Sequence, residues 1–181
     1  MTGARGLQHY LRRGGVIAYP TESCFGLGCD PRNPLAVQRL LRIKGRPERK
    51  GLILIASKFN QLKPYLAPLK PSQIAQLHSK WPGPHTWLIP ASHNCPFWLT
   101  GRHSTIAVRV TAHPAAIRLC REANMALVST SANRSGGKAA RSARECRRLF
   151  GSGVRVIPGL VGSRRRPSTI QDLVSGRILR A

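Results

Sequence analysis

The stretch Leu52-Ile53-Leu54-Ile55-Ala56 decides the fold class of this 181-residue chain. A continuous apolar run of strand length predicts a strand that is buried on both faces, as in sheets covered by helices. Segments with the patterns of strands and helices alternate on both sides of it. The alternation predicts an α/β fold with a mixed sheet, in one domain that spans residues 1–181.

Several flanking elements are marked by their end residues as well as by periodicity. Asn33 is expected to cap a helix in which Pro34 occupies the first helical position. The basic stretch 162–167 is expected to form a mobile loop. The remaining expected elements are helices at 4–13, 72–80, 114–123 and 142–149, and strands at 16–19, 85–90, 105–110, 126–128, 154–157, 168–174 and 177–180.

The charge of the chain is far from balanced. Lys and Arg total 30 against 6 Asp and Glu, which gives a formal net charge of +24. Such a field attracts polyanions, and the arginine fork suits phosphate oxygens, so nucleotide or RNA partners are favoured. A bias toward Arg codons is an equally good explanation of the excess. Six scattered acids leave little material for two-metal or glycosidase chemistry, so catalysis is expected to rest on cations, hydroxyls and backbone groups.

The cysteines and histidines show no pattern of a metal site. None of the five cysteines has C-x-x-C spacing, and the six histidines have no metal-ligand spacing, so no bound metal is expected. Reduced thiols are typical of the cytoplasm, which is the predicted localisation. No apolar run is long enough to span a bilayer, and the N-terminus lacks the apolar segment of a secretory signal, so no membrane partner is expected.

Three polar segments are the candidates for chemistry. Residues 19–23, Tyr-Pro-Thr-Glu-Ser, come where a strand ends, and ligands of α/β sheets bind beyond such ends. Residues 44–51 place four cations in a turn shaped by glycine and proline, which suits a triphosphate. Residues 129–133, Ser-Thr-Ser-Ala-Asn, offer hydroxyls and backbone N–H groups to a phosphate or carboxylate. Each segment has an equally ordinary structural interpretation, as a turn, a helix end or a helix cap.

Taken together and in order, six segments resemble the YrdC-like family of threonylcarbamoyl-AMP synthases in its short bacterial form. Each segment alone has little specificity, whereas six in the family's order cover almost the whole chain. The signature Lys-x-Arg followed by Ser-x-Asn falls on Lys44, Arg46, Ser131 and Asn133. The six segments are Tyr19-Pro20-Thr21-Glu22, Phe25-Gly26-Leu27-Gly28, Lys44-x-Arg46-Pro47, Trp81-Pro82-Gly83-Pro84, Ala107-Val108-Arg109 and Ser129-Thr130-Ser131-Ala132-Asn133.

The resemblance implies a single-domain open fold whose twisted mixed sheet lines a deep basic cavity. It also implies the reaction, in which the amine of L-threonine takes up bicarbonate or CO2 to give a carbamate. The carbamate oxygen attacks the α-phosphate of ATP, and pyrophosphate leaves. Mg2+ is expected with ATP. A partner enzyme complex then transfers the threonylcarbamoyl group to the adenosine beside the tRNA anticodon, and direct binding of tRNA by this chain stays open.

The resemblance also assigns residues. The expected catalytic cations are Lys44, Arg46 and Lys50, which would stabilise charge on the phosphates. The expected ATP contacts are Arg46, Lys50, Thr105, Ser131, Asn133 and Arg180. The expected threonine contacts are Thr21, Ser23, Arg109, Ser129 and Ser168, with Arg109 as the bidentate partner of the carboxylate. No general base is evident, and because the carbamate is already charged, positioning and charge stabilisation can suffice.

Two departures from the family pattern concern threonine. Ser23 stands where many relatives have threonine, and Ile55 stands where longer relatives have a threonine-binding histidine. The sequence therefore supports nucleotide binding more firmly than threonine selectivity.

Three other functions compete with this interpretation. The first is a non-catalytic module that binds tRNA or double-stranded RNA, with steep salt dependence and no release of pyrophosphate. The second is a synthase of a different carbamoyl-adenylate, like the similar domain of hydrogenase-maturation proteins, although those chains are longer and carry zinc-finger-like segments that are absent from this sequence. The third is a paralogue of unknown substrate, against which the intact signature argues.

Overall fold

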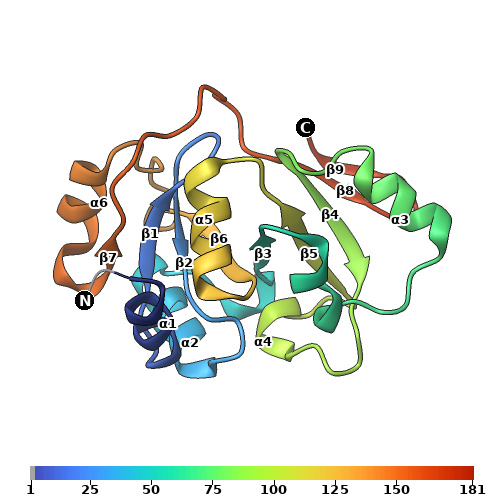
Figure 1. Cartoon of the computed structure of the whole chain (residues 1–181), viewed down its shortest axis with the longest axis horizontal. Helices are drawn as coiled ribbons and strands as arrows, with labels where there is room; N and C mark the ends of the chain where they lie inside the picture. Colours follow the sequence, from blue (N-terminus) through green and yellow to red (C-terminus); the bar gives the residue numbers. More distant parts are fainter. Residues whose placement is uncertain (1–2) are drawn as a thin grey trace.

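The computed structural model describes residues 3–181 and contains one nine-stranded mixed sheet (Figure 1). The strands lie in the order β7-β1-β2-β6-β3-β5-β4-β8-β9. The pairs β1–β7, β3–β5 and β4–β8 are parallel, and the other neighbours are antiparallel. The strands are β1 (Ile17–Pro20), β2 (Phe25–Gly28), β3 (Ile53–Ala56), β4 (His85–Pro90), β5 (Thr105–Val110), β6 (Leu127–Ser131), β7 (Arg155–Val156), β8 (Thr169–Asp172) and β9 (Ile178–Arg180).

Six α-helices within the described residues accompany the sheet, together with short 3-10 turns such as Glu48–Lys50. Asn33 caps α2 by accepting a hydrogen bond from the N–H of Ala36, and Pro34 is the first residue of that helix, as predicted. The helices are α1 (Ala4–Arg12), α2 (Pro34–Lys44), α3 (Pro71–His78), α4 (Phe97–Thr100), α5 (Pro114–Ala123) and α6 (Ala143–Phe150). None of the helices in residues 3–181 is long and apolar enough to cross a membrane.

The two faces of the sheet bury different side chains. On one face, Ile17 of β1 and Ile55 of β3 pack with residues of α1 and α5, and Figure 1 shows these two helices in front of the sheet. On the opposite face, Ala18 and Leu54 pack in the larger cluster with residues of α2. Alternate residues of one strand therefore enter different cores, which explains why the run 52–56 is continuously apolar.

The predicted elements are present with small shifts at their ends, but three features differ from the prediction. One is the short helix α4, which the sequence did not predict. The structure contains β2, which the sequence reading did not predict as a strand, because its two glycines hide the strand pattern. Gly28 needs its small size, since a Cβ there would lie 2.6 Å from the carbonyl oxygen of Val128. In addition, β6 continues beyond 126–128 as far as Ser131, because these polar residues pair with β2 and β3 on either side.

Candidate active site

A cavity of about 360 Å³ opens on one face of the sheet. The helices α1 and α5 cover another part of the same face. Alternate residues of β5, namely Thr105, Ala107 and Arg109, point into it, as do Ser129 and Ser131 of β6. The described lining includes four Lys or Arg side chains and no Asp or Glu. The predicted site residues that line the cavity are Thr21, Ser23, Arg46, Lys50, Thr105, Arg109, Ser129, Ser131, Ser168 and Arg180, whereas Lys44 and Asn133 do not.

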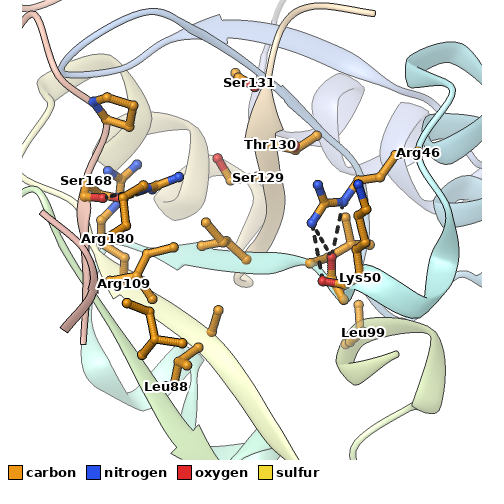
Figure 2. A pocket seen from close by; sticks show the side chains of 18 of the residues that line it. Arg46, Lys50, Leu88, Leu99, Arg109, Ser129, Thr130, Ser131, Ser168 and Arg180 are labelled. Atoms are coloured by element: carbon orange, nitrogen blue, oxygen red, sulfur yellow. Dashed lines mark hydrogen bonds between the residues drawn. The ribbon is translucent and has the colours of Figure 1, made fainter. Parts of the chain in front are cut away.

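One end of the cavity is formed by the turn that follows α2. Gly45 ends the helix in the left-handed conformation (φ 64°), which a glycine adopts without strain. The Arg46 guanidinium donates to the carbonyl oxygen of Gly51 at 3.0 Å and 3.3 Å, and to that of Lys50 at 3.3 Å. Figure 2 shows Arg46 and Lys50 side by side at this end. The turn therefore presents two cations, of which Arg46 is held by hydrogen bonds to the backbone of the turn.

Lys44 lies behind this end and is almost fully buried. Its ammonium donates to the carbonyl oxygen and hydroxyl of Ser131, at 2.6 Å and 3.2 Å, and to Oδ1 and the carbonyl oxygen of Asn133, at 2.7 Å and 3.2 Å. The Ser131 hydroxyl also donates to Asn133 Oδ1 at 2.7 Å. Burial, together with the nearby Arg46, lowers the pKa of Lys44 to about 8. The ammonium thus joins the end of α2 to the end of β6.

The middle of the cavity wall carries the hydroxyls of β6. Ser129 accepts a hydrogen bond of 2.8 Å from the phenol of Tyr19, which is fully buried. Burial raises the pKa of Tyr19, so the phenol keeps its proton and remains a donor. In Figure 2 Ser129, Thr130 and Ser131 lie along β6 between the two groups of cations.

The other end of the cavity carries Arg109 and Arg180, which Figure 2 shows close to Ser168. Arg180 donates to the carbonyl oxygen of Ser168 at 2.9 Å and to its hydroxyl at 3.1 Å. That hydroxyl is also 2.9 Å from the buried hydroxyl of Thr86. Burial and the neighbouring Arg109 lower the pKa of Arg180. The structure therefore places Arg180, an expected ATP contact, beside residues that the sequence assigned to threonine.

Arg109 has one anionic neighbour, Glu22, whose carboxylate oxygen Oε2 lies 3.5 Å from Arg109 Nη2. The side chains of both residues are largely buried, with 10% of Arg109 and 13% of Glu22 exposed. The other oxygen, Oε1, accepts from the hydroxyl of Thr111 at 2.8 Å and from the N–H of Ala112 at 3.2 Å. Burial opposes the charged form of Glu22, but Arg109 and the hydrogen bonds outweigh it and lower its pKa.

The turn between β1 and β2 supplies the remaining polar groups. The Thr21 hydroxyl donates to the carbonyl oxygen of Cys24 at 2.8 Å, and Arg141 donates to that of Ser23 at 2.8 Å. Burial raises the pKa of the Cys24 thiol, so the thiol stays neutral where it lines the cavity. Thr21 is thus held by a local hydrogen bond, and Ser23 by a bond from the distant Arg141.

Sequence reasoning gave no role to Tyr19, Glu22 or Thr86, although the structure connects each of them to a predicted site residue. Tyr19 and Glu22 belong to the segment quoted for its chemistry, but only the fold shows that Tyr19 contacts β6 and that Glu22 contacts the end of β5. Thr86 lies in β4 between His85 and a run of apolar residues, and its polar side chain in a strand was its only signal in the sequence.

The arrangement can hold two anionic groups in one cavity. Arg46 and Lys50 at one end and Arg109 and Arg180 at the other would each attract a negative charge, and arginine forks bind carboxylate or phosphate oxygens. The β6 hydroxyls between them are neutral donors that a buried ligand can use. Such a site suits a ligand with a phosphate at one end and a second anion at the other.

Comparison with known proteins identifies the family of this chain. The family model Sua5_yciO_yrdC, described as "Telomere recombination", matches residues 9–181. A protein of Methylobacillus flagellatus named threonylcarbamoyl-AMP synthase is 64% identical over 98% of both chains. One of the same name from Thiobacillus denitrificans is 58% identical over 97% of this chain and 94% of its own.

A solved structure places the resemblance in three dimensions. The crystal structure of P. abyssi Sua5 complexed with L-threonine superposes with a TM-score of 0.86 at 31% identity, over 93% of this chain. This chain spans about half of that longer protein, 50% of its length. The chain therefore belongs to the Sua5/YciO/YrdC family.

Proposed function

We propose that this protein is an L-threonylcarbamoyladenylate synthase, which condenses L-threonine, bicarbonate or CO2 and ATP into threonylcarbamoyl-AMP and pyrophosphate. The observation that carries the proposal is the cavity itself, with two pairs of cations at opposite ends and a strand of hydroxyls between them. The relatives named for this activity match nearly the full length of the chain.

The triphosphate of ATP would lie at the end formed by Arg46 and Lys50. Pyrophosphate departure builds negative charge on the phosphate oxygens, and fixed cations stabilise that charge. Arg46 is held by the backbone of its own turn, so little reorganisation is needed when the charge develops. Ser131 would contact the nucleotide from β6, with Lys44 and Asn133 acting from behind to hold it in place.

L-Threonine would lie at the opposite end, with its carboxylate against the fork of Arg109. Ser129 and Ser168 flank that position, and the Tyr19 phenol orients the hydroxyl of Ser129. Arg180 would complete the anion site from the Ser168 side, which revises the expectation that it serves only ATP.

The reaction is then largely a matter of positioning. The amine of threonine and bicarbonate give a carbamate and water; the carbamate oxygen forms a bond to the α-phosphorus, and the bond to pyrophosphate breaks. Both reactants are held in one cavity, which makes the attack effectively intramolecular. The cations at each end bind the two anions without neutralising the attacking oxygen between them.

Magnesium would arrive with the nucleotide rather than be held by the protein. The described lining offers no carboxylate, the ligand that Mg2+ prefers in proteins, and residues 3–181 contain no group of three His, Cys, Asp or Glu side chains suited to a metal. The residues therefore do not fit a resident ion, and no step is assigned to one.

The product would pass to an enzyme complex that transfers the threonylcarbamoyl group to tRNA. All five cysteines are free, which supports a reducing compartment such as the cytoplasm. The net charge of +24 supports direct contact with tRNA during that transfer.

The first test is the release of pyrophosphate from ATP by purified protein, with and without L-threonine and bicarbonate. Release that requires both, with serine and glycine as poor substitutes, would establish the activity and its substrate. Absence of release together with salt-sensitive binding of tRNA would instead establish the RNA-binding module. That alternative is favoured by one observation, the excess of arginine on the surface.

A further inference from the structure

Glu22 is the only acidic side chain that reaches Arg109 within the described residues. It does not line the cavity, so it would not touch a bound ligand. Its carboxylate lies beside the arginine, with Oε2 3.5 Å from Nη2. Any effect of Glu22 on the ligand must therefore act through Arg109.

Glu22 is itself fixed by the chain around it. Its Oε1 accepts from Thr111 and Ala112, directly after the strand that carries Arg109. Its backbone carbonyl accepts from the N–H of Arg164 at 3.2 Å. Gly162 approaches so closely that a Cβ there would lie 2.7 Å from the Glu22 carbonyl oxygen. The carboxylate is thus anchored to the segment after β5, and the backbone of Glu22 is anchored to residues 162–164.

Arg109 needs such an anchor because its surroundings are otherwise cationic. Arg180 lies near enough for its pKa to be lowered by the charge of Arg109. Arg109 Nε is buried without a hydrogen-bond partner among the described residues. Without Glu22, repulsion from Arg180 would be unopposed, and the guanidinium would have no fixed orientation.

The geometry points to Glu22 as a positioning residue that orients the Arg109 fork toward the carboxylate of the amino-acid substrate. Glu22 Oε2 lies 3.5 Å from Nη2, so the carboxylate holds one branch of the guanidinium by charge while the Arg109 side chain lines the cavity. This inference rests on the proposed function, since it takes the ligand of Arg109 to be the threonine carboxylate.

The test compares Glu22→Gln with the wild-type protein in threonine-dependent release of pyrophosphate. We expect the KM for L-threonine to rise on the order of tenfold, as for loss of the charged partner of a largely buried ion pair. The KM for ATP should stay within about twofold, because the nucleotide end is untouched. The inhibition constant of L-threoninamide, which lacks the carboxylate, should not change. Glu122→Gln removes the same charge from α5 and serves as the matched control.

Glu22→Asp keeps the charge on a side chain shorter by one methylene and covers the case in which Glu22→Gln fails to fold. It should give an intermediate KM for threonine and a normal KM for ATP. An unchanged or lower KM for threonine in both variants would overturn the inference, since Glu22 would then compete with the substrate for Arg109. Equal effects on threonine, threoninamide and ATP would overturn it in favour of a purely structural role. If wild-type protein releases no pyrophosphate with threonine, the proposed function fails first and this inference falls with it.

Discussion

Lys44 and Arg46 leave the end of the same helix two residues apart, yet they contact different groups. Gly45 between them turns the chain, so Lys44 points inward to Ser131 and Asn133 while Arg46 faces the cavity. The two cations of the signature therefore have different roles. Lys44 holds Ser131 and Asn133 in place, whereas Arg46 is available to a ligand in the cavity. The spacing Lys-x-Arg identified both residues, but only the fold shows that their tasks differ.

Substitution of the two cavity cations at the nucleotide end should remove activity without unfolding the protein. Lys50→Ala is expected to lower turnover by on the order of a hundredfold or more, since a cation beside the developing charge is lost. The Lys50 ammonium has no hydrogen-bond partner within residues 3–181, so the melting temperature should stay unchanged. Arg46→Ala should be equally inactive but slightly less stable, because its bonds to the turn are lost.

The measurements for this pair are pyrophosphate release and thermal melting. Lys58→Ala, which removes an exposed cation away from the cavity, is the control. Normal turnover in Lys50→Ala and Arg46→Ala would remove the phosphate contacts from the proposed site.

Raising the pH through about 8 should weaken ATP binding, because Lys44 loses its proton in the folded chain. A neutral amine has fewer donors for the oxygens of Ser131 and Asn133. The same titration has the opposite effect on the stability of the folded chain, which increases as the pH rises. Between about 8 and the ordinary lysine pKa of 10.5 the unfolded chain binds more protons, so this titration raises the free energy of unfolding as the pH rises.

Calorimetric binding of ATP and denaturant unfolding, each followed across this pH range, check the two signs. Lys44→Met should bind ATP weakly at every pH and show no such step. A step of equal size in Lys44→Met would mean that another group titrates.

At the scale of elements, β2 and β6 are the two strands that form part of the site and that the sequence did not predict correctly. The strand β2 was not predicted, and β6 was predicted too short. Phe25-Gly26-Leu27-Gly28 has no strand-like alternation, since glycine replaces every second side chain to admit Tyr19 and the backbone of β6. Ser129-Thr130-Ser131 looks like a loop because polar residues follow a buried strand. In both cases the cause is the neighbouring strand, which local patterns cannot reveal. The apolar run 52–56, by contrast, was predictable because burial on both faces needs no knowledge of its partners.

Gly28→Ala should test how closely β2 approaches its neighbours. The added Cβ would lie 2.6 Å from the Val128 carbonyl oxygen and 2.9 Å from Tyr19 Cε1. Because backbone cannot yield cheaply, we expect a loss of about 1–3 kcal/mol in the free energy of unfolding. Gly153→Ala, where no atom lies within 4 Å of the new Cβ, should be close to neutral. Equal urea midpoints for the two variants would contradict the close approach.

At the scale of the molecule, most predicted site residues converge although they are distributed from residue 21 to residue 180. A family resemblance could assign them because it carries three-dimensional information that composition lacks. The sequence alone could not assign Arg180 to the Ser168 end or show that Glu22 supports Arg109. The place of Arg180 depends on β8 and β9 extending the sheet beside β4, where His85 pairs with Thr169. The contact of Glu22 depends on the turn after β1 meeting β5, which carries Arg109.

The net charge of +24 makes a prediction about RNA that is independent of the reaction. Binding of tRNA should weaken steeply with salt, by about 0.7–0.9 decades of affinity per decade of salt for each phosphate contacted. An unrelated double-stranded RNA of equal length should bind about as well, because surface arginines read phosphates and not bases. Fluorescence anisotropy over a salt series measures both quantities. Binding that is insensitive to salt would show that the charge does not contribute.

The pairing of β6 with β2 and β3 fixes the distance between the hydroxyl-bearing residues of β6 as well as the cavity wall that they form. Ser129 and Ser131 project from the same side of a strand, and two residues of a strand rise about 6.7 Å. On the proposed assignment one hydroxyl belongs to the amino acid and the other to the nucleotide, so the strand acts as a ruler between them. If one residue were inserted or deleted between Ser129 and Ser131, their side chains would lie on opposite faces of the sheet. The distance between the amino-acid site and the phosphate site can therefore change only by the insertion or deletion of two residues at a time. Single substitutions in β6 would leave this distance unchanged.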